Sequence, residues 1–366
     1  MKTVRLVHCA DLHIDSPFKG ISEMHPDLGE LLYQSTYQSF KNIVDLAIRE
    51  KVDCVLISGD IYDSTDKSLR AQLKFRDGLN RLSGEGIPVF ILCGNHDPLS
   101  SWSATLEWPE GVFIFPGDEV RRVPLQKNGE VIAQICGISF AEQNIYENLA
   151  LKFTRMDEDV PCIGLLHTNI GINTGHEPYA PCTVEDLSAK GMDYWALGHV
   201  HTHLVLRAGN PAIVYSGCSQ SRSPVEIGQK GCCLVTIEKG IDPDIQFIST
   251  DVVRYKSDAI DISSCLTIDS VISSIEEKCE EIATNMDKRH AIIRLSLTGR
   301  TDLHSELHKR DADIDILRKV REDFEGRDPW IWLEKIILST AGTYDLAILR
   351  RGNDFIADII SIYDEL

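Results

Sequence analysis

Paired cysteine spacings are missing from this sequence. It contains 11 cysteines, an odd number, and no Cys-x-x-Cys pair. A disulfide framework or a structural zinc site requires such pairs, so the sequence argues against both. Cys9, Cys54, Cys93 and Cys162 stand inside apolar, strand-like runs. Because free thiols are among the most buried side chains, we expect reduced cysteines in the core.

Long apolar runs are also missing. No stretch of about 18 uncharged apolar residues occurs, as a transmembrane helix would require. The first eight residues lack the apolar stretch and the small-residue cleavage site of a signal peptide. These two absences predict a cytoplasmic protein without membrane contact.

Basic residues are scarce. The 366 residues include 37 Lys and Arg against 56 Asp and Glu, which gives a formal net charge of -19. Affinity for nucleic acids comes largely from Lys and Arg that replace phosphate counterions. The composition therefore opposes unaided DNA binding.

At about 150 residues per domain, the length of the chain predicts two domains.

Five short apolar runs each end in a polar cluster. They are rich in Val and Ile and bounded by Gly, which is typical of strands buried on both faces. The runs are Val4–Cys9, Val52–Ile57, Val89–Cys93, Cys162–Leu166 and Tyr194–Leu197. Apolar residues at helical spacing separate the first three runs, which predicts an α/β fold with parallel strands. The carboxyl ends of such strands share one rim, where ligands bind.

The later part of the chain has a different pattern. Val- and Ile-rich stretches with Gly and Pro turns, at 129–140 and 212–248, predict antiparallel strands that complete a second sheet. Helices are expected at 268–285, 314–324 and 354–363, with strands at 291–297 and 331–338. We therefore expect one domain over residues 1–250 and a small α+β accessory or cap domain over residues 251–366.

The polar clusters at the strand ends offer imidazoles, carboxylates and one amide oxygen, without a thiolate. This set suits Mn, Fe or Zn. It is too large for one ion, whereas two ions about 3.5 to 4 Å apart that share a carboxylate would use all of it. The cluster residues are Asp11, His13, Asp60, Asp63, Asn95, His96, His167, His199 and His201.

These clusters resemble the five-part signature of the calcineurin-like metallophosphoesterases, over roughly residues 5–201. The resemblance implies a two-sheet αββα sandwich and two divalent metal ions, with Mn as the expected metal. It also implies the ligands: Asp11, His13 and His201 for the first metal, Asn95, His167 and His199 for the second, and Asp60 as the bridge.

Two further residues are expected to take part in catalysis. In two-metal sites a hydroxide held between the ions attacks phosphorus in line. His96 directly follows the ligand Asn95 and is expected to be the general acid that protonates the leaving oxygen. Asp63, three residues after Asp60, is expected to orient the His96 imidazole with its carboxylate.

Several segments narrow the resemblance further. Phosphoprotein phosphatases would show Arg-Gly after Asp63 and Glu in place of Asp97, which disfavours protein dephosphorylation. The segments 10–18, 179–182, 194–201, 220–222 and 226–232 are similar to the bacterial DNA-repair exonuclease family of the SbcD and YhaO type. That resemblance implies a metal-dependent DNA phosphodiesterase, an exonuclease or endonuclease subunit. It also implies DNA as substrate and an SbcC-like ABC ATPase as partner, while a simple homodimer stays open.

Four other residues are candidates for substrate contacts. His176 and Tyr179 lie in the loop that follows His167, and such loops often line pockets. His203 continues the Gly-His-x-His segment, and Arg222 belongs to a loop near 216–222 that is expected to approach the phosphate backbone.

Two other functions stay open. The acidic balance favours a phosphodiesterase or phosphatase that acts on nucleotides or other small phosphoesters. A non-catalytic scaffold is the third interpretation, and it is disfavoured because every metal ligand is in place.

Overall fold

The computed structural model describes residues 2–16, 26–63, 67–101, 106–156, 159–171 and 177–344, together with a few single positions after 344. The chain splits into two compact units, Met1–Arg254 and Tyr255–Leu366. In the described ranges no helix is long and apolar enough to span a membrane. The helix expected at 354–363 lies mostly outside the described residues.

The first unit contains two six-stranded sheets. The first sheet has the order β12-β11-β1-β2-β3-β4. Strands β1 to β4 run parallel, whereas β11 is antiparallel to both β1 and β12. The bounds are β1 (Thr3–Cys9), β2 (Cys54–Ser58), β3 (Val89–Leu92), β4 (Val112–Ile114), β11 (Gly231–Glu238) and β12 (Asp244–Ser249).

The second sheet has the order β5-β6-β7-β8-β10-β9. Its central strands β6, β7, β8 and β10 are parallel, and the two edge strands are antiparallel to their neighbours. The bounds are β5 (Arg121–Lys127), β6 (Glu130–Gly137), β7 (Cys162–His167), β8 (Tyr194–Gly198), β9 (Leu204–Arg207) and β10 (Ala212–Tyr215).

One expectation about the sheets is wrong. Residues 212–248 do not all belong to the second sheet, because β11 and β12 extend the first sheet beside β1. Only β10 joins the second sheet from that region. The apolar pattern predicts where the strands are but not which strands pair with one another. β11 is buried along most of its length, and a strand of that kind suits either sheet.

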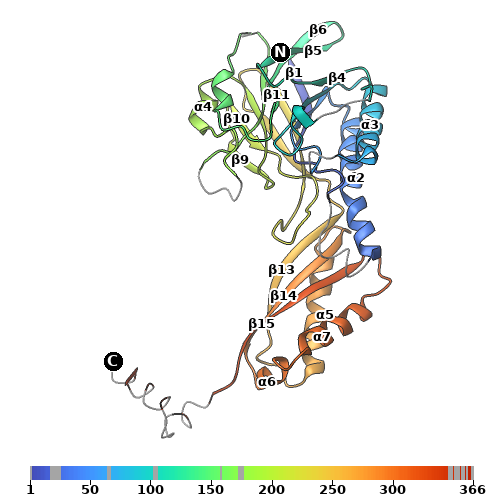
Figure 1. Ribbon diagram of the computed structural model, residues 1–366, viewed down its shortest axis with the longest axis vertical. Coiled ribbons are helices and arrows are strands. Elements are labelled where there is room, and N and C mark those ends of the chain that lie inside the picture. Colours follow the sequence, from blue (N-terminus) through green and yellow to red (C-terminus); the bar gives the residue numbers. More distant parts are fainter. Residues whose placement is uncertain are drawn as a thin grey trace. The chain divides into compact units, whose positions relative to one another are not determined.

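The layers of the first unit follow the order helix, sheet, sheet, helix (Figure 1). Leu6 and Leu56 of the first sheet pack against Ile163 and Leu165 of the second. Helices α2 (Pro26–Arg49) and α3 (Leu69–Gly84) cover the other face of the first sheet. The short helices α4 (Val184–Ser188) and η2 (Leu149–Lys152) pack on the second sheet. The expected αββα sandwich is therefore confirmed.

Local chemistry explains the start of α3. The side chain of Ser68 accepts a hydrogen bond from the main-chain nitrogen of Ala71, which satisfies a free donor in the first turn. Phe75 and Leu79, four residues apart on one face, are buried in the core beneath the helix. Burying side chains of this size stabilises the fold by about 1.5 to 3 kcal/mol each. A further short helix, η1 (Leu99–Ser101), follows β3.

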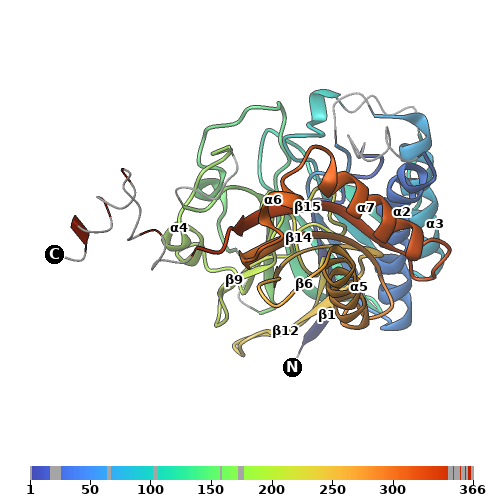
Figure 2. The same ribbon diagram turned by 90° about the horizontal axis from the view of Figure 1, so that it is seen from below.

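The second unit is a small α+β domain, as the sequence predicts. Its sheet has the order β13-β14-β15, and α5 and α7 pack into the same core (Figure 2). Alternate residues of β14, such as Ile293 and Leu295, enter that core. The bounds are β13 (Val253–Asp261), α5 (Ile268–Thr284), β14 (His290–Arg300), α6 (His304–Leu307), α7 (Ala312–Asp323) and β15 (Ile331–Ala341).

Candidate active site

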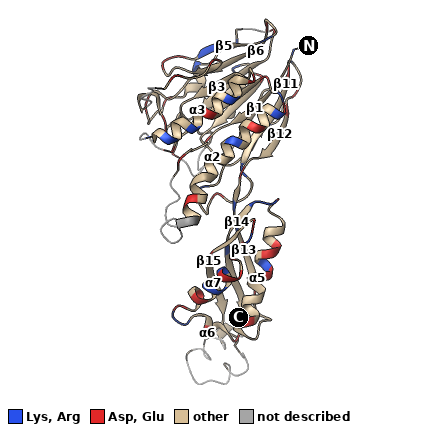
Figure 3. Ribbon diagram, turned by 90° about the vertical axis from the view of Figure 1, so that its right-hand side faces the viewer, with Lys and Arg blue, Asp and Glu red and all other residues tan. Residues whose placement is uncertain are grey.

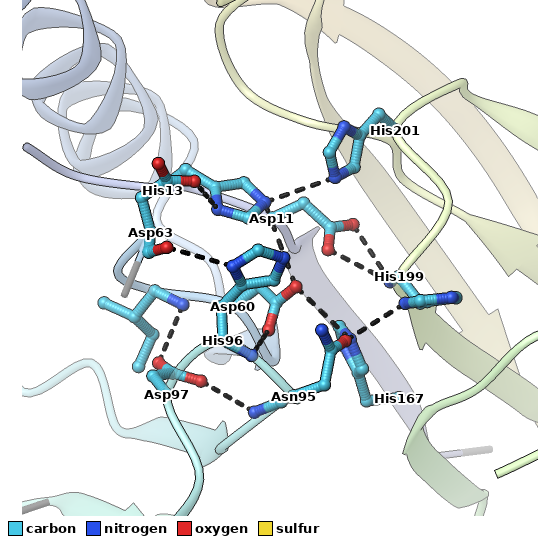
Figure 4. A network of polar contacts seen from close by, with 12 residues as sticks. Asp11, His13, Asp60, Asp63, Asn95, His96, Asp97, His167, His199 and His201 are labelled. Atoms are coloured by element: carbon cyan, nitrogen blue, oxygen red, sulfur yellow. Dashed lines mark hydrogen bonds and ion pairs between the residues drawn. The ribbon is translucent and has the colours of Figure 1, made fainter. Parts of the chain in front are cut away.

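The polar side chains at the carboxyl ends of β1, β2, β3, β7 and β8 meet at one place (Figure 4). Main-chain hydrogen bonds join the loops that carry them. The nitrogen of Asp11 donates to the oxygen of Gly59 at 3.0 Å, and that of His13 to the oxygen of Asp60 at 3.1 Å. The parallel strands thus deliver the loops to one rim, and the loops then bind one another.

Four residues at this rim have left-handed backbone. Their φ angles are 50° for Asp11, 42° for His13, 51° for Asp60 and 100° for His199. Each such non-glycine residue costs on the order of 1–3 kcal/mol, and such residues concentrate at functional sites. The surrounding hydrogen bonds offset this cost.

The glycines of the motifs have a steric role. A Cβ on Gly94 would lie 2.2 Å from Oδ1 of Asp60, and one on Gly198 would lie 1.9 Å from the main-chain oxygen of Ser58. Only glycine lets the backbones approach this closely. Gly94 therefore sets how near the loops after β3 and β2 of the first sheet can come, and Gly198 sets how near β8 of the second sheet can come to β2 of the first.

One group of donors consists of Asp11, His13 and His201, whose ligand atoms all lie within 4.8 Å of one another. Nε2 of His13 and Nε2 of His201 are 3.2 Å apart. The main-chain nitrogen of His199 donates to both oxygens of Asp11, at 3.0 and 3.1 Å, and fixes that carboxylate.

A second group consists of Asp60, His167 and His199, with Asn95 among them. Oδ1 of Asn95 lies 3.0 Å from Nε2 of His167 and 3.2 Å from Nδ1 of His199. Oδ2 of Asp60 lies 3.4 Å from Nε2 of His167 and 3.9 Å from Nε2 of His13. Asp60 therefore stands between the two groups.

These separations suit divalent cations. Nitrogen and oxygen ligands at about 2.1 Å from one cation lie roughly 3.0 to 3.4 Å from each other. The donors are imidazole, carboxylate and amide groups, and all except His201 are buried. The residues present thus fit two divalent metal ions that share Asp60.

The ionisable side chains of the two donor groups have pKa values that are shifted in different directions. Burial alone would lower the pKa of His167, but the carboxylates of Asp60 and Asp11 raise it to about 9. Burial lowers the pKa of His13 to about 3, with help from the charge of Arg222. Burial also raises the pKa of the Asp11 carboxyl. Metal ions take the place of protons on such groups, so binding is expected to depend on pH.

The structure corrects the expected contact between Asp63 and His96. Nδ1 of His96 lies 3.0 Å from the main-chain oxygen of Asp63, not from its carboxylate. The carboxylate lies 3.1 Å from Nδ1 of His13 and accepts a hydrogen bond from Arg222. Arg222 forms an ion pair with this carboxylate, which still lies in one group of donors with His13 and His96, their ligand atoms all within 4.8 Å of one another.

Asp97 anchors the loops beneath the site. Its carboxylate accepts hydrogen bonds from the main-chain nitrogens of Gly94 at 2.7 Å and Ile61 at 2.9 Å. The loops that carry Asp60 and Asn95 are thereby tied together.

The four candidates for substrate contacts have separate outcomes. The Tyr179 ring lies 6.0 Å from the His199 ring at the edge of the site. His203 turns away: Nδ1 contacts the main-chain oxygen of Tyr215 at 3.0 Å, and the ring stacks on Phe247. Packing therefore holds the His203 ring, and its contact with substrate stays a prediction. His176 lies outside the described residues.

Arg222 and Glu226 form a pair next to the first donor group. Oε1 of Glu226 lies 2.7 Å from Nδ1 of His201, and Oε2 accepts the main-chain nitrogen of Arg222 at 2.7 Å. Burial would raise the pKa of Glu226, but the hydrogen bond with His201 and the charge of Arg222 lower it to about 2. Sequence reasoning missed this role of Glu226, because nothing in its spacing separates it from a loop carboxylate.

Comparisons with known proteins give the family of the chain. The family model "Calcineurin-like phosphoesterase" matches residues 4–203, and "Metallophosphoesterase YhaO, middle domain" matches residues 255–341. The chain is 38% identical over 327 residues to the metallophosphoesterase YhaO of Bacillus subtilis (strain 168), covering 89% of this chain and 79% of that protein.

More distant relatives carry the name "DNA double-strand break repair protein Mre11". The Sulfurisphaera tokodaii protein is 26% identical over 334 residues, covering 86% of this chain and 78% of that protein. The Thermoplasma acidophilum protein is 26% identical over 343 residues, with coverages of 87% and 84%.

Proposed function

Because the chain belongs to the calcineurin-like phosphoesterase family, in the YhaO group, it is a metal-dependent hydrolase, and we propose that it cleaves the phosphodiester bonds of DNA. One observation carries the catalytic part of the proposal. Two groups of donors meet at one rim with the Asp60 carboxylate between them. Such a pair of sites suits phosphoester cleavage.

The ligands are proposed as the sequence predicts them: Asp11, His13 and His201 for one ion, Asn95, His167 and His199 for the other, and Asp60 for both. When bound, two divalent ions, with Mn proposed and Fe or Zn as alternatives, supply Lewis acidity and an activated water. All of these ligands except His201 are buried, and hydrogen bonds such as those from the main-chain nitrogen of His199 to Asp11 fix their side chains.

His96 is proposed as the general acid. Its Nδ1 donates to the main-chain oxygen of Asp63, which fixes the ring and leaves Nε2 to carry the transferred proton. The ring lies 5.0 Å from that of His13, beside the first donor group. From there it is placed to protonate the oxygen that leaves phosphorus.

DNA is favoured as substrate by the Mre11 relatives and by local features of the surface. Helix α3 carries Arg70, Lys74, Arg76 and Arg81 against a single acid, Asp77, which runs against the acidic balance of the chain (Figure 3). At the edge of the site, the rings of Tyr179 and Tyr146 lie 5.9 Å apart, and aromatic rings of this kind stack on bases.

Partners are proposed on the same grounds. With a net charge of -19, the chain itself supplies little electrostatic affinity for DNA. An SbcC-like ABC ATPase, or a second copy of the chain, would add basic surface. The second unit is proposed to position the DNA, as in the resembling nucleases.

A phosphodiesterase or phosphatase acting on small phosphoesters is the second candidate function, and the acidic net charge of the chain favours it.

One assay separates these functions. The protein is incubated with Mn²⁺ and end-labelled single- and double-stranded DNA, beside a cyclic nucleotide and bis-p-nitrophenyl phosphate. Cleavage of DNA is expected. Hydrolysis of the small diesters with intact DNA would contradict the nuclease and favour the second candidate. No hydrolysis with metal demonstrably bound would favour a non-catalytic scaffold.

A further inference from the structure

Two of the four buried or half-buried histidines at the donor groups are held by neutral partners. Nδ1 of His167 lies 2.9 Å from the main-chain oxygen of Ser58. Nε2 of His199 lies 2.9 Å from the main-chain oxygen of Glu177. Both histidines belong to the second donor group, so its imidazoles are oriented by carbonyl dipoles.

Carboxylates lie against the other two histidines. Nδ1 of His13 lies 3.1 Å from Oδ1 of Asp63, and Nδ1 of His201 lies 2.7 Å from Oε1 of Glu226. Both belong to the first donor group. An ionised carboxylate fixes the ring and makes the opposite nitrogen a stronger ligand than a neutral carbonyl does.

Arg222 joins the two carboxylates. Its Nη1 donates to Asp63, and its Nη2 lies 3.7 Å from Oε1 of Glu226. Its own main-chain nitrogen donates to the other oxygen of Glu226, and Ser221 donates to the main-chain oxygen of Glu226 at 2.6 Å. The planar guanidinium thus lies between the two carboxylates, hydrogen-bonded to Asp63 and within ion-pair distance of Glu226, an arrangement that the single ammonium group of a lysine does not reproduce.

We propose that Glu226 and Arg222 are positioning residues that make the first metal position bind its ion more tightly than the second. Glu226 accepts a hydrogen bond from Nδ1–H of His201, which leaves the Nε2 lone pair directed toward the ligands Asp11 and His13. Arg222 fixes the positions of the Glu226 and Asp63 carboxylates relative to each other. This inference rests on the two-metal site of the proposed function.

Calorimetric titration of chelator-treated protein with Mn²⁺ tests the proposal. Wild type is expected to bind two ions with unequal affinities. In Glu226→Gln, which keeps the shape but not the charge, the tighter ion should bind about 10 to 100 times more weakly, while the weaker one is unchanged. The matched control is Glu50→Gln, since Glu50 also pairs with an arginine, Arg5, but on the surface. It should leave both affinities as in wild type.

Arg222→Lys provides a second variant that keeps the positive charge. It should weaken the same ion, because lysine cannot bridge both carboxylates. A raised KM with an unchanged Mn²⁺ isotherm would mean that Arg222 contacts substrate. That result would overturn the assignment of Arg222 as a positioning residue. Unchanged isotherms in Glu226→Gln, or equal weakening of both ions, would overturn the proposal for Glu226. If wild type bound no Mn²⁺, the two-metal function itself would fail, a result that neither variant can produce.

Discussion

Nδ1 of His96 lies 3.0 Å from the main-chain oxygen of Asp63. A carbonyl oxygen can only accept a hydrogen bond, so this contact makes Nδ1 the donor and leaves Nε2 for proton transfer. The orientation of the proposed acid thus depends on the backbone after β2 and not on an ionisable side chain.

The first prediction concerns His96→Asn. Asparagine cannot supply a proton, so turnover should fall by about 10² to 10⁴-fold, the range typical of a lost general acid. Both metal ions should stay bound, because His96 is not among the proposed ligands. Turnover and metal content are measured on the same preparation. Loss of metal, or a near-normal rate, would contradict the role.

The second prediction distinguishes the two contacts of Asp63. Because its carboxylate contacts His13 and Arg222, Asp63→Asn should weaken Mn²⁺ binding by about 10 to 100-fold. Weaker binding lowers turnover at limiting Mn²⁺, and most of that loss should be recovered when the Mn²⁺ concentration is raised. Activity as a function of Mn²⁺ concentration checks this. A loss of turnover that persists at saturating Mn²⁺ would instead place the carboxylate beside His96, as the sequence suggested.

The third prediction tests the close approach at Gly198. A methyl group there would overlap the main-chain oxygen of Ser58, so Gly198→Ala should destabilise the fold by about 1–3 kcal/mol and weaken metal binding. The control is Gly84→Ala, at the end of α3, where an added Cβ meets nothing within 4 Å. Urea unfolding of both variants gives the comparison. Equal stabilities would show that the loops can move apart.

Much of this fold follows from the sequence for a physical reason. Strands buried on both faces, such as β2 and β7, give unbroken apolar runs, and their polar ends mark the rim. Pairing between distant strands leaves no such trace, so the place of β11 beside β1 was not predictable. The Asp-x-His spacing likewise predicted that Asp11 and His13 lie together, as they do in the structure.

The missed features of the site share another cause. The contacts of Glu226 with His201 and of Asp63 with His13 depend on side-chain direction across loops far apart in the chain. Asp63 lies three residues after Asp60 and His96 directly after Asn95, which suggested that the two residues meet but left unknown which atoms make the contact. His203 shows the same limit, since it follows His201 by two residues yet packs on Phe247.

The last prediction concerns stability and pH at His8. This side chain is fully buried, with Nδ1 2.9 Å from the Tyr194 hydroxyl and Nε2 3.2 Å from the main-chain oxygen of Leu197. Burial lowers its pKa from 6.5 to about 3. Between these values the unfolded chain binds a proton that the folded chain does not, so stability falls as the pH falls below 6.5.

In His8→Gln this contribution is absent. Between pH 6.5 and 4.5, wild type should therefore lose about 2 kcal/mol more unfolding free energy than the variant, since one pKa unit corresponds to 1.36 kcal/mol. Other titrating groups, including the metal-site histidines, are common to both proteins and cancel in the difference. Urea unfolding of chelator-treated protein at the two pH values measures it. Parallel losses in the two proteins would mean that His8 is protonated in the folded state, with its charge satisfied between the sheets.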